Sequence, residues 1–557
     1  MELDQGTVDQ EPGRATWKRQ IEFTLAGIGC AVGLGNIWRF PYLCYRSGGG
    51  AFLVPYLLML LVMGIPLLYM ELILGQYMRR GPVHALAKAC PLLKGTEAYS
   101  ICPPSLYWSI ILVSSFNIVK LKMQRMTINQ QLCCSYRMLE RTAGVEESGV
   151  LRWELFLLLL LAWILLYFCI FKGIKSTGKV VYFTALFPYV ILLALLINNV
   201  QLPGAMEGIR FFIVPNWEKL LELEVWVNAA AQIFNSIGIG FGSLMAMSSY
   251  NNFNNNILKD TLAISITNSL TSILAGFVIF SAFGYMSHLQ NIPVSELAVD
   301  GPGLVFVVYP QAFATMPVAP LWAILFFFML LCLGLDSQFA MVEVMVTSLM
   351  DEFGGPLMKF LRHKEMLVLA VCSTAFLLGI PHVMQVGIYV FQLMDHYTAI
   401  VSLMFLAFFE VLAICGLYGV RRLSANLKEM TGNRPNIFFK VCWMFVAPLL
   451  ITIILVFTII QFKPARYEDY VYPPWAQGIG WVIAMASIIW IPLGALHTLW
   501  VLPGSFTEVL LESLGQWACL LYSENGPTTE RRKNRKEIKI AVEAVQISQT
   551  WQKANTI

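Results

Sequence analysis

Polar side chains that can hold ions recur at helical spacing inside otherwise apolar stretches of the sequence. Gln232 and Ser236 stand four residues apart, as do Asn268 and Ser272, so each pair shares one face of a helix. Carboxylate, hydroxyl and amide oxygens suit a hard cation, whereas hydroxyl and amide N–H groups suit a halide. Inserting the Asp336 carboxylate at membrane depth costs about 2.5 to 3.5 kcal/mol of free energy. This residue therefore needs a cation or a partner. Ion binding and simple interhelical hydrogen bonding both remain open.

Glycine interrupts two long apolar segments, at residues 31–36 (AVGLGN) and 238–242 (GIGFG). In hydrocarbon, a backbone group without a partner costs several kcal/mol. A broken helix therefore persists only where its freed groups face protein, water, an ion or a substrate. Two such breaks predict one binding site at the midplane of a transporter.

The composition is that of an integral membrane protein, with 57% hydrophobic and 13% charged residues and a mean hydropathy of +0.65. The 557 residues suffice for about a dozen spans of ~20 residues and leave no room for a large soluble domain. The net charge of +4 is spread over loops and tail, which argues against a nucleic-acid partner. The twelve cysteines show no metal spacing, and the sequence contains neither an HExxH pair nor a Walker motif, so no enzyme signature is present.

Hydropathy predicts an all-α membrane protein with twelve spans. The expected spans are 21–45, 51–74, 106–119, 155–171, 180–197, 225–248, 258–283, 321–349, 366–380, 388–417, 441–462 and 479–500. Basic residues in alternate connections place both termini in the cytoplasm. We therefore expect a cytoplasmic segment at 1–20, a membrane domain at 21–503 and a cytoplasmic tail at 504–557.

The third expected span departs from this pattern. Its apolar stretch, 106–119, holds about fourteen residues, short of the roughly twenty that a bilayer requires. Lys120, Lys122 and Arg125 follow it on the side that should be extracellular. We therefore expect the region from 100 to 150 to be abnormal.

Six short motifs stand in order along the chain. They are residues 29–41 (GCAVGLGNIWRFP), 48–52 (GGGAF), 64–67 (GIPL), 175–184 (KSTGKVVYFT), 301–303 (GPG) and 334–337 (GLDS). Together they resemble the sodium- and chloride-dependent neurotransmitter transporters, the neurotransmitter:sodium symporter family, and within it the glycine, proline and neutral amino-acid branch. The resemblance implies a twelve-span inverted-repeat transporter fold. In that fold spans one to five and six to ten are the repeats, two spans are appended, and spans one and six are unwound at mid-membrane.

The resemblance also implies roles for the polar residues, with Na⁺ and Cl⁻ as co-transported ions. The implied first sodium site, completed by a substrate carboxylate, comprises Ala31, Asn36, Ser236 and Asn268. The implied second sodium site comprises Gly29, Val32, Leu333, Asp336 and Ser337. The implied chloride site comprises Tyr56, Gln232, Ser236 and Ser272.

By the same resemblance, the substrate is a small neutral amino acid that brings its own carboxylate, because Gly33 stands where the monoamine carriers hold an aspartate. The carboxylate is expected at the start of the half-helix near Gly35, on free N–H groups and the positive end of the helix dipole. The expected pocket lining comprises Gly33, Gly35, Ile37, Asn235, Gly238, Ile239 and Phe241.

Charge pairs suggest gates on both sides of this pocket. Arg39 and Asp395 match the family's extracellular gate. The residues that match its cytoplasmic gate are Arg14, Trp17, Tyr250 and Asp351. We expect exposed pairs worth only about 0 to 1 kcal/mol, weak enough to break in each cycle. The resemblance implies alternating access in the plasma membrane by rocking of spans one, two, six and seven, and is compatible with a homo- or hetero-oligomer.

The sequence also departs from the family pattern. No tyrosine pair occurs midway along the third span, where residues 115–119 read SFNIV, and the long extracellular loop after it is nearly missing. Asn235 stands where an aromatic residue usually closes over the substrate. Two functions of different class therefore remain. One is an active sodium- and chloride-driven symporter, and the other is a transport-incompetent membrane protein that folds poorly or acts by association with a full-length relative. An uncoupled ion channel is a third alternative.

Overall fold

The structure, a computed structural model, is almost entirely helical. It describes residues 16–93, 95–96, 142, 144–147, 149–171, 174–297, 319–361, 363–460, 462, 464–467 and 470–501. The third expected span at 106–119, most of the expected N-terminal segment and the whole 504–557 tail lie outside the described residues.

The elements follow one another as helices, with η marking 3₁₀ or π turns. Up to residue 290 they are α1 (Gln20–Ala31), η1 (Gly35–Arg39), α2 (Phe40–Arg46), η2 (Gly50–Phe52), α3 (Leu53–Met59), η3 (Leu60–Gly64), α4 (Ile65–Met78), α5 (Pro82–Ala89), α8 (Trp153–Ile170), α9 (Ile174–Thr184), α10 (Phe187–Val200), α11 (Ala205–Ile213), η6 (Trp217–Leu221), α12 (Leu223–Ile237), α13 (Ser243–Ser248) and α14 (Ile257–Gln290). After it come η7 (Val294–Glu296), α16 (Ala319–Leu361), α17 (Lys364–Gly379), η8 (Ile380–Val383), α18 (Gly387–His396), η9 (Tyr397–Ser402), α19 (Leu403–Val411), η10 (Leu412–Gly419), α20 (Val420–Thr431), α21 (Ile437–Val441), η11 (Cys442–Val446), α22 (Ala447–Ile460), α23 (Pro474–Ile488) and α24 (Trp490–Val501). The strands β1 (Arg466–Tyr467) and β2 (Tyr470–Val471) pair antiparallel.

Many of these helices can cross a membrane. Within the described residues, nine helices are long and apolar enough to do so. The number rises to ten if the bent pair Gln20–Ala31 and Gly35–Arg46 is counted as one span. The sixth expected span is present as two half-helices, α12 and α13, separated at residues 238–242. The chain is thus a multi-pass membrane protein with two interrupted spans.

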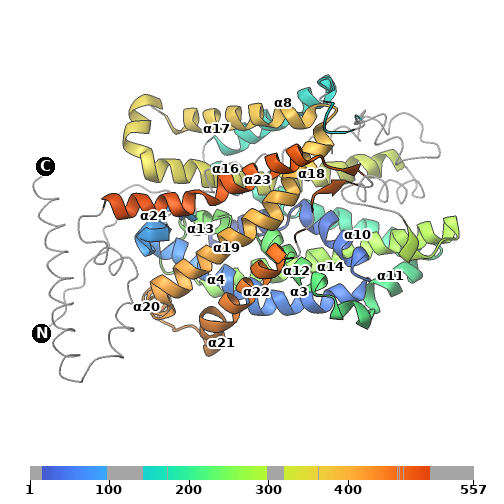
Figure 1. The fold of residues 1–557 in the computed structure, drawn as a ribbon, viewed down its shortest axis with the longest axis horizontal. Coiled ribbons are helices and arrows are strands. Elements are labelled where there is room, and N and C mark those ends of the chain that lie inside the picture. The colour runs from blue at the N-terminus through green and yellow to red at the C-terminus, as the bar shows by residue number, and fades with distance from the viewer. Residues whose placement is uncertain are drawn as a thin grey trace, which may run out of the picture.

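The core joins elements that are far apart in the sequence. One large buried cluster draws on α1, the second span, α12, α13, α14 and α19, and a smaller cluster joins α8, α16 and α17. Figure 1 shows α8 and α17 side by side along one edge of the molecule, with α23 and α24 crossing the near face. Large apolar side chains such as Phe168 and Leu377 point outward, as hydrocarbon-facing helices require.

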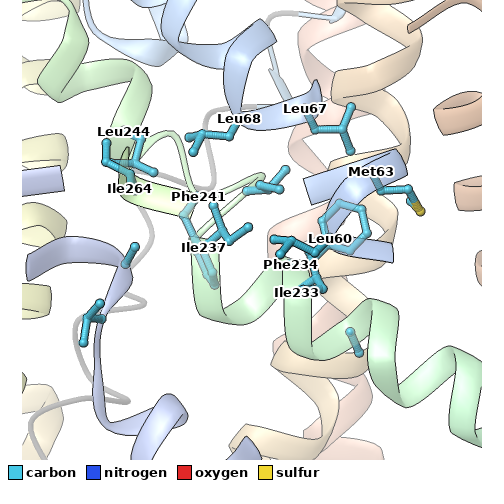
Figure 2. Packing of buried hydrophobic residues seen from close by; sticks show 14 of the residues in the cluster. Leu60, Met63, Leu67, Leu68, Ile233, Phe234, Ile237, Phe241, Leu244 and Ile264 are labelled. Atoms are coloured by element: carbon cyan, nitrogen blue, oxygen red, sulfur yellow. The ribbon is translucent and has the colours of Figure 1, made fainter. Parts of the chain in front are cut away.

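One face of α12 packs tightly on the second span. Ile233 lies near Leu60 in Figure 2, and Ile233, Ile237, Leu60 and Met63 belong to one buried cluster. A Cβ added to Gly64 would lie 2.9 Å from Ile233 Cγ2 and 3.1 Å from Ile237 Cδ1. A small residue at this position therefore lets the two helices approach closely.

A second close approach predicts a stability effect. A Cβ on Gly75 of α4 would overlap both Ser248 Oγ and the Met245 carbonyl of α13. We expect Gly75→Ala to lower the free energy of unfolding by about 1–3 kcal/mol or more, because backbone must move to make room. The control is Gly478→Ala on α23, where a Cβ meets no atom within 4 Å. Thermal melting of the detergent-purified proteins tests this, and equal melting temperatures for the two variants would contradict it.

Candidate functional site

The first span breaks immediately after α1. That helix ends at Ala31, and Val32 leaves the helical region with φ −84° and ψ 89° before η1 begins. The Gly33 N–H donates to Asn36 Oδ1 over 3.2 Å, and forms no helical bond to the Gly29 carbonyl four residues back. The end of α1 therefore presents backbone carbonyls that are released from the helix, and the two halves of the span meet at 49°.

The sixth span breaks between α12 and α13. Gly238, Gly240 and Gly242 have φ values of +81°, +80° and +69°, which side chains other than glycine rarely tolerate. The Gly238 N–H still donates to the Phe234 carbonyl at 2.9 Å. The Gly240 N–H instead donates to Glu71 Oε1 of α4 at 2.8 Å. The three glycines thus turn backbone groups of this span away from helical hydrogen bonding.

Asn36 connects the first break to α14 and, through it, to the second break. Its Nδ2 donates to Asn268 Oδ1 at 2.7 Å and to Ser272 Oγ at 2.9 Å. Asn268 Nδ2 in turn donates to Ser236 Oγ at 2.8 Å. All four side chains are buried. The residues predicted for the first sodium site therefore lie together, with Ala31 at the end of α1, and their oxygens suit a hard cation.

The residues predicted for chloride adjoin this cluster. Gln232 Nε2 donates to the Gly35 carbonyl at 3.4 Å. The Tyr56 hydroxyl donates to Ser269 Oγ at 3.3 Å and also contacts Ser272. These side chains supply N–H and O–H donors without carrying a negative charge, so an anion is the ligand that they suit.

Asp336 of α16 faces the first break. Its Oδ1 accepts from Thr184 Oγ1 of α9 at 2.5 Å, while Oδ2 is buried with no hydrogen-bond partner among the described residues. A Cβ on Gly29 would lie 2.9 Å from that Oδ2, so the carboxylate abuts the end of α1. Ser337 Oγ lies 3.5 Å from the Cys30 carbonyl. A buried carboxylate oxygen beside released carbonyls fits a monovalent cation.

The rest of the predicted second sodium set lies nearby. The Ser337 hydroxyl donates to the Leu333 carbonyl at 3.3 Å, one turn earlier on α16. Val32 is the residue that follows α1. The structure thus brings all five members of this set to the junction of α1 and α16.

The predicted substrate-lining residues flank the two breaks. A Cβ on Gly35 would meet no atom within 4 Å, so open space lies beside that residue. Ile37 is fully buried in the core, and Asn235 is half-buried. The remaining positions at the breaks are buried, namely Gly33, Gly238, Ile239 and Phe241.

Arg39 and Asp395 form an ion pair between η1 and α18. Their Nη1 and Oδ1 atoms are 3.5 Å apart, and the side chains are only 10% and 14% exposed. The sequence-based expectation that this pair is exposed to solvent is therefore wrong. Both side chains are largely enclosed, and removing one partner of a buried pair is strongly destabilising.

This burial predicts a non-additive effect. We expect Arg39→Gln and Asp395→Asn each to lower the free energy of unfolding by about 3–5 kcal/mol, because each leaves one charge buried without its partner. The double variant should recover much of the loss. Melting temperatures of the four purified proteins measure the coupling, and simple addition of the two single losses would contradict it.

Two residues of the predicted cytoplasmic gate are in contact. The Trp17 N–H donates to the Tyr250 carbonyl at 3.2 Å, and its indole Nε1 donates to the Met247 carbonyl at 3.1 Å. The Tyr250 hydroxyl donates to Glu343 Oε1 of α16 at 3.0 Å. The segment before α1 is thus hydrogen-bonded to residues at the end of α13.

The other two residues of the predicted cytoplasmic gate, Asp351 and Arg14, are not part of this contact among the described residues. Asp351 accepts from the Gly81 N–H at 2.5 Å and pairs with Arg80 at 3.8 Å. It thereby links α16 to the start of α5. Arg14 lies outside the described residues.

Sequence reasoning missed Glu71, the carboxylate that holds the second break. It is fully buried, and its carboxyl group neighbours that of Glu410 of α19, itself 1% exposed. The available signal was the one used for Asp336, a carboxylate inside an apolar stretch. Thr184 was also missed, because a single hydroxyl in an apolar segment carries no comparable signal.

Discontinuous spans whose breaks meet over buried polar groups define a class of membrane transport protein. The chain belongs to the sodium:neurotransmitter symporter family, which it matches over residues 14–129 and 113–502. The resemblance stated from the motifs is thereby confirmed. The two matches overlap at 113–129, within and just after the third expected span.

Similar proteins are named as transporters and not as enzymes. The sodium- and chloride-dependent GABA transporter ine of Drosophila melanogaster is 46% identical over 528 residues, which cover 88% of this chain and 56% of that protein. The sodium- and chloride-dependent glycine transporter 2 of Xenopus laevis is 40% identical over 595 residues, which cover 94% of this chain and 74% of that protein. The sodium- and chloride-dependent GABA transporter 2 of Homo sapiens is 43% identical over 532 residues, with 89% and 88% covered. The chain spans little more than half the length of the fly relative.

Proposed function

We propose that this chain is a sodium- and chloride-coupled secondary active symporter of small neutral amino acids or related solutes. Family membership supports the class, and the relatives are named as sodium- and chloride-dependent transporters. The single observation that carries the proposal is the run of hydrogen bonds from Asn36 through Asn268 to Ser236, which links the two interrupted spans through one buried polar cluster.

The ions have distinct places in this proposal. One sodium is held by the Ala31 carbonyl and the oxygens of Asn36, Ser236 and Asn268. A second sodium is held by Asp336 Oδ2, the Ser337 hydroxyl and carbonyls at the end of α1 and on α16. Chloride is held by the donors of Tyr56, Gln232, Ser236 and Ser272, and its charge offsets that of the cations.

The substrate would lie between the breaks. Its carboxylate meets the first sodium and the N–H groups at the start of η1, near Gly35, where the helix dipole is positive. Gly33 supplies no anionic side chain for a substrate amine, so a solute with its own carboxylate is favoured. Glycine and GABA, the substrates named for the relatives, are both of this kind.

Transport would follow alternating access in a twelve-span inverted-repeat fold in the plasma membrane, with both termini cytoplasmic. The Arg39–Asp395 pair would close one side and the contact of Trp17 with Tyr250 the other. Each sodium charge moving down 100 mV releases about 2.3 kcal/mol. Because tenfold accumulation costs about 1.4 kcal/mol, one or two sodium ions can drive steep uptake without ATP.

Uptake in cells tests the proposal. Labelled glycine, GABA, proline and leucine are offered in sodium chloride, in choline chloride and in sodium gluconate, with surface biotinylation as the control. We expect accumulation of at least one solute that requires both ions. Surface-expressed protein with neither uptake nor sodium-dependent binding would refute it, and current that persists without any solute would indicate a channel.

A transport-incompetent protein is the second candidate, and one observation favours it. The third expected span holds about fourteen apolar residues instead of roughly twenty, and the two family matches meet at that place. Retention inside the cell, relieved by co-expression of a full-length relative, would support this candidate over the symporter.

A further inference from the structure

Asn235 is the one residue between Ala229 and Ile237 that is not buried. Helices on the outside of the molecule expose large apolar side chains, as α8 does with Leu157 and Phe168. This stretch of α12 exposes none. The accessible surface of Asn235 therefore belongs to an opening in the interior and not to the lipid-facing surface.

The helical position of Asn235 turns it away from the second span. Ile233 and Ile237 pack against that span (Figure 2). At 100° per residue, Asn235 lies about 160° around the helix from each of them. It follows Gln232 by three residues, and Gln232 Nε2 contacts the Gly35 carbonyl at 3.4 Å. Asn235 thus lies on the side of α12 that looks toward the first break, within one turn of it.

The backbone of the two breaks near this place is not tightly packed. A Cβ on Gly35 would meet no atom within 4 Å, and one on Gly238 would meet only Ser243 Oγ at 3.5 Å and Phe241 Cδ2 at 3.8 Å. Unlike the side chains of Asn36 and its neighbours, the side chain of Asn235 makes no hydrogen bond to any described residue. Its carboxamide keeps two N–H donors and one carbonyl acceptor available.

We propose that Asn235 determines substrate specificity by hydrogen-bonding a polar group on the side chain of the substrate. The carrier then prefers amino acids bearing a hydroxyl or carboxamide over apolar ones of the same size. When a ligand displaces water from the opening, an apolar side chain leaves the carboxamide unpaired, whereas a polar one satisfies it. This inference rests on the proposed symport function and narrows its substrate class.

Isosteric ligand pairs test the inference directly. The purified full chain is titrated with serine against 2-aminobutyrate and with asparagine against leucine, following the ligand-induced rise in melting temperature in sodium chloride and in choline chloride. The variant is Asn235→Leu, which keeps the size and removes the polar group. The matched control is Asn228→Leu, at another half-buried asparagine of α12, two turns earlier.

In the wild type and in Asn228→Leu, we expect the polar member of each pair to bind at least about tenfold more tightly than the apolar member when sodium is present. In Asn235→Leu the preference should vanish or reverse while binding still requires sodium. An unchanged preference in Asn235→Leu, or a wild type that favours leucine and 2-aminobutyrate, would overturn the role of Asn235 and leave the symport function intact. Absence of sodium-dependent binding for every ligand in every protein would instead overturn the proposed function.

Discussion

Replacing Asp336 with asparagine is expected to reduce sodium-driven uptake by about 100-fold or more, because the variant removes the charge that balances a desolvated cation. Oδ2 of this carboxylate is buried beside the end of α1 without a hydrogen bond among the described residues. In sodium-free buffer we do not expect the variant to be less stable than the wild type. There the melting temperature should stay the same or rise, since the variant no longer buries an uncompensated charge.

Sodium titrations of uptake and of melting temperature measure both effects. The matched control is Glu352→Gln, an exposed carboxylate on the same helix, which should leave both curves unchanged. An unaltered half-saturating sodium concentration in Asp336→Asn would show that this carboxylate does not meet the ion.

Replacing Glu71 with leucine is expected to prevent most of the protein from folding. The change leaves the buried Gly240 N–H without its acceptor, at a cost of about 1–3 kcal/mol. It also puts an apolar side chain in place of the carboxyl group that neighbours Glu410, which is itself 1% exposed. Surface biotinylation and the yield of monodisperse protein after detergent extraction report the loss.

Glu71→Gln separates the hydrogen bond from the size of the side chain. Its amide oxygen can still accept from Gly240, so we expect surface expression much closer to wild type. Similar behaviour of the leucine and glutamine variants would mean that the bond to the second break contributes little.

The sequence identified those site residues whose chemistry conflicts with their surroundings. Asp336 stands out because a carboxylate is costly in hydrocarbon, and the glycines at 238–242 stand out because they interrupt an apolar helix, whereas Asn268 was predicted only through the family resemblance. Thr184 and Ser269 could not be found in this way, because a hydroxyl in a span usually bonds its own helix. Their contacts with Asp336 and Tyr56 depend on helices that are 152 and 213 residues away along the chain.

The same limit applies to the fold. Hydropathy places spans such as α8 and α22 to within a few residues, because length and apolarity alone define them. It cannot reveal the π turns at Gly35–Arg39 and Leu412–Gly419, which arise from local packing. Nor could it show that Arg39 and Asp395 are enclosed, since burial of a charge pair depends on contacts between parts of the chain that are far apart in the sequence.

The contact at Gly75 decides which parts of the protein can shift independently. Since α4 and α13 touch there without room for a methyl group, neither can slide past the other, and any displacement of α13 must drag α4 with it. The other half of the sixth span, α12, packs against the same second span at Gly64, so both halves are anchored to one continuous helix. Segments about 170 residues apart in the sequence are therefore expected to move together, with the second and sixth spans behaving as one rigid unit.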